Sequence, residues 1–525
     1  MSLLFSGRSL RLTFLALFLW CLSQPVFAQA DLQKLDAYYQ KALKDWNVPG
    51  MAIAIVKNDS VVFAKGYGVR DQQKGGTVDA NTIFGIASNT KAYTAAALAM
   101  LVDEGKLSWD DPVTKYLPYL QLYDPYVTQN LNIRDLLSHR VGLQTFSGDI
   151  LWYNTTFSRK EILQRAKYLK PAYPFRGGYG YSNLMFIAAG EVIEAISGKP
   201  WEQFIQERIF KPLGMNRSYT SVNQLKGIEN VTKPHGNPTS ENGKPVPTVL
   251  TAWDSWNPAA GIFTSVNEDA KWLKLQLNRG TYKGQRLFSE NASHTMWTMH
   301  NATPVAKEME KITPSVHFSG AGLGWMLNDY QGKKIVVHSG GHEGMNSRTV
   351  LVPEEKLGIV ILTNSMSSIM APIANYTIDQ FLGIQNGRDW SQFNLEAAAK
   401  AQAAEKAAEA KTAKQKTAKA KLTRDLNAYA GTFHSPYYGD AVVTVQNGKL
   451  MLSLVSAPAL GGELTLWQPD IFNLAWKNNF ALLTPTKARF LPGPDGTISE
   501  LRLDANNPDL HFSELEFSRV NTAKP

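Results

Sequence analysis

A serine and a lysine three residues apart, Ser88 and Lys91, are the first residues of this sequence whose types and spacing suggest chemistry. A serine hydroxyl is a weak nucleophile until a base removes its proton, and a desolvated, neutral lysine is one such base. Residues at i and i+3 share a helix face, so the amine can approach the hydroxyl. Such a pair also arises by chance about twice in a chain of this length. A helix cap followed by a solvated lysine would explain it equally well.

Two further stretches combine glycines with polar side chains. Residues 178–183 read GYGYSN, a loop that opens a helix and presents the Tyr181 phenol and the Asn183 amide two positions apart. Residues 338–344 read HSGGHEG, in which a strand runs into glycines that allow a substrate backbone to approach closely. Each stretch taken alone is also explained as an ordinary helix start or a tight turn.

Together these residues form three short motifs in a fixed order: Ser88-x-x-Lys91, Tyr181-x-Asn183 and His338-x-Gly340. The set resembles that of the serine β-lactamase and penicillin-binding-protein superfamily, closest to its class C β-lactamase, esterase and D-aminopeptidase branch. Local resemblances at 136–143, 258–265 and 322–325 extend the likeness over residues 31 to about 390. It implies an α/β (α+β) β-lactamase-like fold, with an antiparallel sheet flanked by helices and a helical lobe.

The resemblance also implies roles. Ser88 would attack a carbonyl and become acylated, while Lys91 and Tyr181 would share the work of general base and of proton donor to the leaving group. A Lys91 ammonium would lower the pKa of Tyr181, since a phenol ordinarily ionises near pH 10. Backbone N–H groups of Ser88 and Gly341 would hold the oxyanion. Asn183 would hydrogen-bond a substrate amide or orient Lys91.

One motif departs from the penicillin-recognising members, which have Lys-Thr-Gly where this chain has His338-Ser339-Gly340. A lysine offers a fixed positive charge for a substrate carboxylate, whereas a histidine is largely neutral at pH 7. His338 therefore favours the esterase or peptidase members over efficient β-lactam turnover, and it is a candidate proton relay to Tyr181 or Ser88. Arg348, on the next predicted strand, is either a substitute carboxylate anchor or a solvated arginine. His139 is interpreted as structural.

The elements that must position these residues follow from periodicity. The run after Lys91 is apolar nearly all round and ends at Gly105, which predicts a buried helix with a left-handed glycine cap. A hairpin is predicted over 51–56 and 61–65, and three strands over 334–338, 347–352 and 357–362. The stretch between them is mainly helical. We therefore expect one antiparallel sheet assembled from both ends of the module, with the site in the groove between sheet and lobe.

The two ends of the chain have their own compositions. Residues 1–28 read as a secretory signal peptide, with Arg8 and Arg11 before an apolar stretch and cleavage after Ala28 or Ala30, which predicts a periplasmic or secreted bacterial protein. The stretch is too short to span a bilayer. It contains the only cysteine, Cys21, after a bulky tryptophan that disfavours a lipid anchor, so the mature chain has no disulfide.

The hydrolase-like module is predicted to occupy residues 31–392. An Ala/Lys-rich stretch at 393–424 predicts a helical linker, at most about 45 Å long if fully helical. Residues 425–525 predict a small barrel of about eight strands, with an Asn-Gly hairpin turn at 447–448. This tail resembles the lipocalin-like domain of some β-lactamase-related hydrolases. Capping the groove, mediating oligomers and binding an envelope ligand all remain open as its role.

Composition limits the partners. The net charge of +9 comes without a nucleic-acid motif, so we interpret it as solubilising, with no nucleic-acid partner. The sequence has no H-E-x-x-H run and no P-loop, and predicts no metal and no cofactor. The main hypothesis is an exported serine hydrolase acting on small esters or peptides, including peptides with D-configured residues. The alternatives are a class C-like β-lactamase, and a covalent penicillin-binding receptor without efficient turnover. The oligomeric state is left open.

Overall fold

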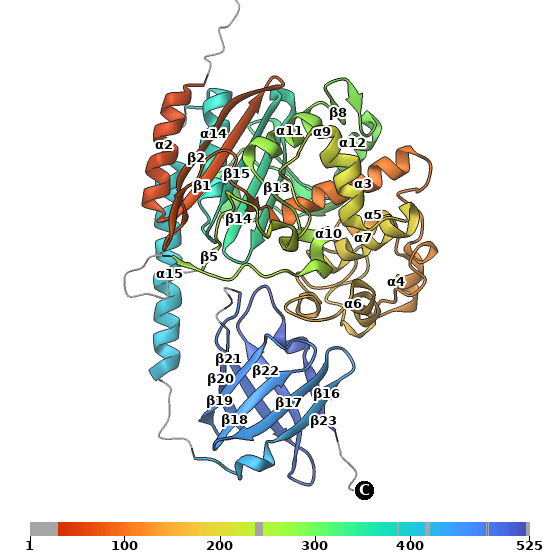
Figure 1. Cartoon of the computed structure of the whole chain (residues 1–525), viewed down its shortest axis with the longest axis vertical. Helices are drawn as coiled ribbons and strands as arrows, with labels where there is room; N and C mark the ends of the chain where they lie inside the picture. Colours follow the sequence, from red (N-terminus) through yellow and green to blue (C-terminus); the bar gives the residue numbers. More distant parts are fainter. Residues whose placement is uncertain are drawn as a thin grey trace, which may run out of the picture.

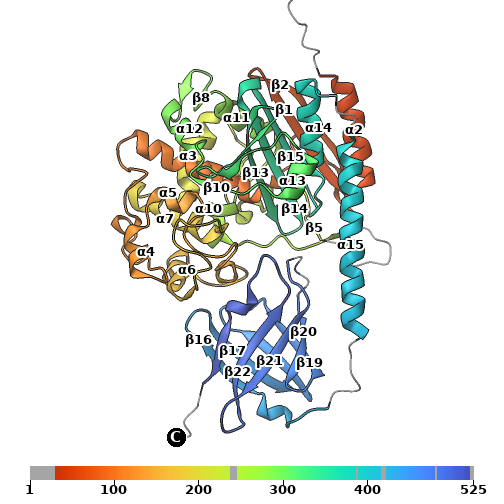
Figure 2. The same cartoon turned by 180° about the vertical axis from the view of Figure 1, so that it is seen from behind.

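The computed structural model describes residues 30–236, 245–385, 388–414, 421–478, 480 and 482–520. The predicted signal peptide and Cys21 lie outside these residues. An α/β body stands above a β-barrel, and one long helix, α15 (Trp390–Lys414), runs down one side from the first toward the second (Figure 1, Figure 2).

The α/β body is built on one nine-stranded antiparallel sheet. In spatial order its strands are β10 (Asn301–Thr303), β11 (Ser319–Ala321), β12 (Met326–Tyr330), β13 (Lys333–His342), β14 (Met345–Val352), β15 (Leu357–Thr363), β1 (Gly50–Lys57), β2 (Ser60–Asp71) and β3 (Gly75–Thr77). β1 pairs with β15, with Met51 opposite Thr363, so strands from both ends of the module meet in the middle of the sheet. The predicted sheet is confirmed.

Side chains of β1 alternate between two cores. Met51, Ile53 and Ile55 pack with α2 (Leu32–Asp45) and α14 (Met370–Leu382) on one face. The intervening residues of β1 pack into the larger core on the other face, which α11 (Val266–Leu277) covers. Because both faces are covered, the strand is a continuous apolar run. All of its residues are buried except Lys57, which is half-buried.

The helical lobe lies beside the sheet and consists of short helices with α3 (Thr90–Asp103) at its centre (Figure 1). The others are α4 (Pro125–Asn130), α5 (Ile133–Leu137), α6 (Arg159–Arg165), α7 (Asn183–Ser197), α8 (Trp201–Ile205), a π-helical turn (Gln206–Phe210), α9 (Lys211–Leu213), α10 (Asn257–Ala260) and α12 (Glu290–Met296). The short helix α13 (Lys307–Ile312) lies on the sheet side of the body, near α14 and α15 (Figure 2). Three small ribbons complete the body: β4 (Phe84–Gly85) with β7 (Phe263–Thr264), β5 (His235–Gly236) with β6 (Val246–Pro247), and β8 (Thr281–Tyr282) with β9 (Gln285–Arg286).

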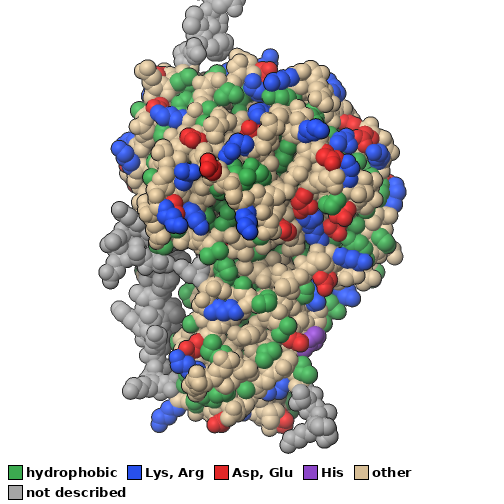
Figure 3. Space-filling model, viewed as in Figure 1, with side chains coloured by type: hydrophobic (Ala, Val, Ile, Leu, Met, Phe, Trp, Pro, Cys, Tyr) green, Lys and Arg blue, Asp and Glu red, His purple; other side chains and the backbone are tan. Residues whose placement is uncertain are grey.

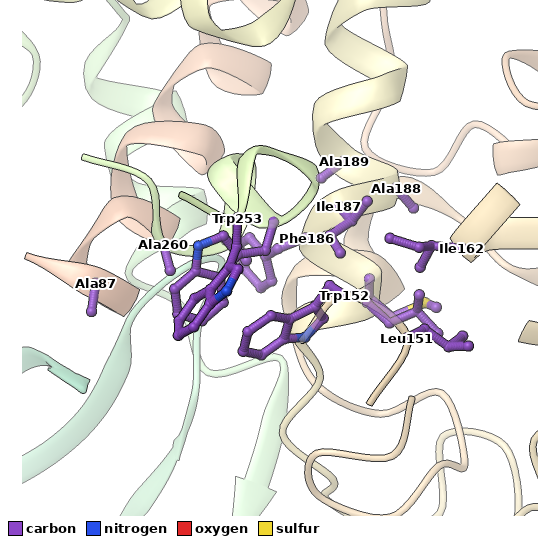
Figure 4. Packing of buried hydrophobic residues seen from close by; sticks show 14 of the residues in the cluster. Ala87, Leu151, Trp152, Ile162, Phe186, Ile187, Ala188, Ala189, Trp253 and Ala260 are labelled. Carbon is purple, nitrogen blue, oxygen red and sulfur yellow. The ribbon is translucent and has the colours of Figure 1, made fainter. Parts of the chain in front are cut away.

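Helix α3 is buried on every side from Thr90 to Leu101, as its apolar sequence predicts. Gly105 follows with φ of 69°, in the left-handed region that a glycine cap requires. Near the start of the helix, Ala87 and Ala260 lie close to a group of large aromatic side chains that includes Trp253 and Phe186 (Figure 4). The nucleophile candidate is thus held at the edge of a densely packed core.

The C-terminal domain is a closed eight-stranded barrel. Its strands are β16 (Gly431–Ser435), β17 (Gly439–Gln446), β18 (Lys449–Leu454), β19 (Gly461–Gln468), β20 (Ile471–Trp476), β21 (Thr486–Pro492), β22 (Ile498–Ala505) and β23 (Glu516–Arg519). Each strand pairs antiparallel with the next, and β16 closes the barrel against β23. Asn447 and Gly448 have φ of 49° and 74°, the conformation for which the Asn-Gly turn was selected.

Helix α15 begins inside the α/β body. The Trp390 indole donates a hydrogen bond to Asp379 of α14 at 2.7 Å. The first turn of α15 therefore packs against the α/β body. The exact domain boundaries remain predictions. Among the described residues, no helix is long and apolar enough to cross a membrane.

Candidate active site

Ser88 lies on a short 3-10 turn, Ala87–Asn89, that leads into α3. Ala87 has φ of 46°, a left-handed conformation that is strained for alanine and that the surrounding packing must hold in place. The turn is fixed to β14, because Asn89 donates to the Ser347 hydroxyl at 2.7 Å and that hydroxyl donates to the Ile86 carbonyl at 2.5 Å. The hydroxyl of Ser88 is therefore held in place from the sheet side.

Lys91 lies directly behind Ser88 and is fully buried, with 0% of its side chain exposed. Its Nζ is within hydrogen-bond distance of three oxygens: Ser88 Oγ at 3.0 Å, Asn183 Oδ1 at 2.6 Å and Ala259 O at 3.0 Å. Burial lowers the pKa of the amine to about 7, against a smaller opposing effect of the Asp149 carboxylate. A substantial fraction of Lys91 is thus neutral near pH 7, the form in which it can accept a proton.

Asn183 is the first residue of α7, and both the oxygen and the nitrogen of its side-chain amide form hydrogen bonds. Its oxygen accepts from Lys91, and its nitrogen donates to Asp149 Oδ2 at 2.6 Å. Of the two roles considered for Asn183, the geometry supports orientation of Lys91. Asp149 is 2% exposed, and burial raises its pKa to about 8. Sequence reasoning missed Asp149, since its only signal is an acidic residue ahead of an apolar run.

Tyr181 approaches the same hydroxyl from the helical lobe, and its interaction with Ser88 lowers the pKa of the phenol by less than burial raises it. Lys91 Nζ lies 4.8 Å from the centre of the ring. The expectation that Lys91 lowers the pKa of Tyr181 is wrong, because burial raises the pKa of the phenol and Lys91 itself loses its charge near neutrality. Tyr181 is therefore a protonated hydroxyl in the resting site.

His139 supports the tyrosine. Its ring stacks on Tyr181 with centroids 4.4 Å apart, and its Nδ1 accepts a hydrogen bond from the Ser182 N–H at 3.1 Å. Burial lowers the pKa of His139 well below its usual range, so the ring is neutral. These contacts agree with the interpretation of His139 as a structural residue.

His338 is 3% exposed, and its ring centre lies 6.2 Å from that of Tyr181. Burial, with a contribution from the charge of Lys91, lowers its pKa to about 3, so it is neutral at all ordinary pH values. The hydrogen bond described for its ring joins Nδ1 to the Ser339 carbonyl at 2.7 Å. A proton relay from His338 to Tyr181 or Ser88 remains a prediction.

The two glycines after His338 do different things. A Cβ on Gly340 would lie 2.2 Å from the Ile86 carbonyl and 2.9 Å from the Ser88 nitrogen. A glycine is therefore required at position 340 because β13 packs directly against the turn that carries Ser88. The expected reason, close approach of a substrate backbone, is not needed to explain it. Gly341 has more room, since its nearest neighbour, Asn346 Oδ1, would be 3.5 Å away, and it lines the pocket at Ser88.

Comparison with known proteins agrees with this geometry. Residues 35–382 match the family described as Beta-lactamase. The chain belongs to the β-lactamase family. Residues 415–519 match a second family, described as a domain of unknown function (DUF3471).

Individual relatives of this β-lactamase-family protein are distant. Unguisins hydrolase ungD' from Aspergillus campestris is 29% identical over 78% of this chain and 76% of its own length. Protein flp from Staphylococcus aureus strain MW2 is 28% identical over 67% of this chain and 66% of its own. Among solved structures, an octameric penicillin-binding protein homologue from Pyrococcus abyssi is 23% identical with a TM-score of 0.59, and covers 93% of this chain and 99% of that one. SurE has a TM-score of 0.54 at 20% identity, over 93% of this chain and 98% of its own. Members of the family act on small-molecule or peptide substrates.

The β-lactamase-family site opens into a pocket of about 530 Å³. Ser88, Tyr181 and Gly341 line its reactive end, and Phe146, Trp152 and Trp256 form aromatic walls. Arg348 also lines the pocket, where it donates to the Ser339 hydroxyl at 2.8 Å and burial lowers its pKa to about 10. Arg348 is thus half-buried at the edge of the site.

The barrel contributes to the same pocket through Leu482, on the connection from β20 to β21, and Asp509, beyond β22. Neither residue was found by sequence reasoning, because no motif marks them. The Leu482 N–H donates to Glu343 at 3.2 Å, and the His511 ring is 2.9 Å from the Thr145 carbonyl. Of the three roles left open for the tail domain, closure of the active-site groove is the one that this geometry supports.

Charges elsewhere are dispersed. On the face drawn in Figure 3, Lys and Arg side chains are interspersed with Asp and Glu over the described surface, which fits a solubilising role. Within the described ranges, no group of three or more His, Cys, Asp or Glu side chains is arranged to hold a metal ion.

Proposed function

We propose that this protein is an exported serine hydrolase that cleaves ester or amide bonds through an acyl-enzyme on Ser88. The observation that carries the proposal is the position of Lys91, whose buried amine, with a pKa lowered to about 7, lies 3.0 Å from the Ser88 hydroxyl. A base of this kind is what a serine nucleophile requires. The family match and the hydrolase name of the Aspergillus campestris relative support the same reaction class.

Acylation follows from these positions. Neutral Lys91 accepts the proton of Ser88 as Oγ attacks the substrate carbonyl, and the backbone N–H groups of Ser88 and Gly341 stabilise the oxyanion. As the tetrahedral intermediate collapses, the Tyr181 hydroxyl donates its proton to the departing alkoxide or amine. Transfer of the proton from the Lys91 ammonium to the Tyr181 phenolate then leaves both side chains neutral.

Deacylation repeats these steps with water. Neutral Lys91 accepts a proton from the water that attacks the acyl carbon, the second tetrahedral intermediate collapses, and Lys91 gives that proton to the departing Ser88 oxygen. The carboxylic acid product then leaves the pocket.

The proposed export rests on the signal peptide predicted at residues 1–28.

The walls of the site limit the substrates. A neutral His338 replaces the lysine of penicillin-recognising members, and aromatic residues dominate one side of the pocket. Small esters and peptides with an apolar group, including D-configured residues, suit these walls.

The second candidate, class C-like β-lactamase activity, is favoured by one observation: Arg348 lies beside Ser339 in the pocket, where it can bind the carboxylate of a β-lactam.

Intact-mass analysis of the mature protein after brief mixing with a fluorophosphonate, a penicillin or a p-nitrophenyl ester tests the proposal. We expect labelling and ester turnover in the wild type and neither in Ser88→Ala. Ser60→Ala, on an exposed hairpin turn, is the matched control and should behave as the wild type. Full ester hydrolysis by Ser88→Ala would overturn the proposal. Penicillin turnover would select the β-lactamase, and a lasting penicillin adduct without turnover would select a covalent receptor.

A further inference from the structure

The barrel domain is hydrogen-bonded to a turn of the hydrolase module, residues 147–149, that lies close to Lys91. Glu514, on the segment that precedes β23, accepts hydrogen bonds from the Ser147 hydroxyl at 2.6 Å and from the Gly148 N–H at 3.1 Å. Tyr437, also in the barrel, donates to the same carboxylate at 2.8 Å. One carboxylate therefore joins the barrel to two consecutive residues of the module.

The turn that Glu514 holds continues directly into Asp149. Gly148 has φ of 87°, and a Cβ there would lie 3.1 Å from Leu169 and 3.2 Å from Leu184, so the backbone has little freedom at this point. Asp149 in turn accepts from Asn183, and Asn183 accepts from Lys91, each at 2.6 Å. A continuous series of contacts thus leads from the barrel to the catalytic amine.

We propose that the barrel is a working part of the active site: Glu514 fixes the turn at 147–149, and Asp149 is the positioning residue that holds Asn183 and, through it, Lys91. This inference rests on the proposed function, in which Lys91 is the base that activates Ser88. It adds two residues to the machinery, one from each domain, that no motif of the family resemblance contains.

Asp149 holds Asn183 as a largely neutral group. Burial raises the pKa of its carboxyl to about 8, so near pH 7 it is mostly protonated, and its Oδ2 accepts from Asn183 in that form. The other titratable groups that face the Lys91 amine are Tyr181, His139 and His338, with Glu514 behind Asp149; burial keeps the phenol protonated and both histidines neutral. An Asn at position 149 keeps an oxygen for Asn183 and, like the protonated carboxyl, carries no charge.

The first experiment compares Asp149→Asn and Asp149→Ala in the full chain, with p-nitrophenyl acetate hydrolysis and the rate of fluorophosphonate labelling as readouts. We expect Asp149→Ala to lower kcat by about 10- to 100-fold, because Asn183 and Lys91 lose their fixed position. Asp149→Asn, which keeps an oxygen for Asn183, should recover most of the rate. A wild-type rate in Asp149→Ala, or no recovery of the rate in Asp149→Asn, would overturn the role of Asp149.

The second experiment tests the barrel. Glu514→Ala should lower kcat by about tenfold or more, and Glu514→Gln, which can still bond to the turn, should recover part of that loss. Glu516→Gln is the matched control: Glu516 contacts Lys170 of the module at 2.8 Å but not the turn, and its replacement should leave kcat unchanged. Thermal melting of each variant separates lost positioning from lost folding.

A folded Glu514→Ala with wild-type kcat would show that the turn holds itself and would overturn the role of the barrel. An equal loss in Glu516→Gln would do the same, because it would reduce the effect to general weakening of the interface. If Ser88→Ala abolishes activity while these variants resemble the wild type, only this inference fails. If Ser88→Ala is active, both the proposed function and this inference fail.

Discussion

At the scale of single residues, the environment of Lys91 decides what the site can do. An exposed lysine has a pKa near 10.4 and is almost wholly protonated at neutral pH. Burial of its side chain between α3, to which it belongs, and α7 lowers the pKa to about 7, and the neighbouring His139 and His338 are neutral. The same burial keeps Tyr181 protonated, so base and acid coexist on either side of Ser88 at one pH.

This arrangement predicts a pH dependence for acylation. Because the neutral amine is the active form and the pKa of Lys91 is lowered, the rate should rise through a pH of about 7 and fall about tenfold per unit well below it. The burst phase with p-nitrophenyl acetate, followed from pH 5 to 9, measures it. Lys91→Arg, which cannot become neutral, should lose the burst while Lys106→Arg, on the surface, keeps it. An acylation rate independent of pH between 5 and 9 would contradict the assignment of Lys91 as base.

At the scale of elements, the parts of the fold that local sequence determines were predictable. The apolar run of α3, the alternating strands of the barrel and the continuous apolar strands of the central sheet each follow from side-chain periodicity over a few residues. Asp149, Leu482 and Asp509 were not predictable, because a turn brings the first, and docking of a second domain brings the other two, to the pocket that Ser88 lines. The pKa of Tyr181 was misjudged for a related reason, since burial is a property of the packed structure.

The contact between β13 and the nucleophile turn gives a prediction for an element. Gly340→Ala would put a Cβ 2.2 Å from the Ile86 carbonyl, so the strand and the turn must separate. We expect a loss of about 1–3 kcal/mol in the free energy of unfolding and slower fluorophosphonate labelling of Ser88. Chemical denaturation measures the first effect and intact mass the second. Gly341→Ala, where the nearest atom would be 3.5 Å away, should leave the free energy of unfolding close to that of the wild type. Equal stability of both variants would show that the turn adapts to the strand.

At the scale of the whole molecule, the two halves of the chain share one active-site pocket. The Pyrococcus abyssi homologue and SurE match 93% of this chain, so their folds extend over more than the residues 35–382 that define the β-lactamase family match. In this protein, loops at one end of the barrel face the hydrolase module (Figure 1), and Leu482 and Asp509 of the barrel domain line the pocket that contains Ser88. Loops can change length and side chains without disturbing the barrel, so the tail domain is suited to set which acyl groups enter.

Leu482 offers the sharpest test of that arrangement. Its N–H is held by Glu343, so truncation of the side chain leaves the backbone anchor in place and only enlarges the pocket. Leu482→Ala should therefore raise the ratio of kcat/KM for p-nitrophenyl decanoate to that for p-nitrophenyl acetate by about tenfold, because the longer acyl group gains room that acetate does not need. Val455→Ala, an exposed apolar residue of the same barrel, is the matched control and should leave the ratio unchanged. If the ratio is the same in all three proteins, acyl length is sensed by the walls of the hydrolase module alone and the barrel only covers the site. A shift confined to Leu482→Ala would place part of the specificity of this hydrolase in a domain more than 390 residues along the chain from its nucleophile.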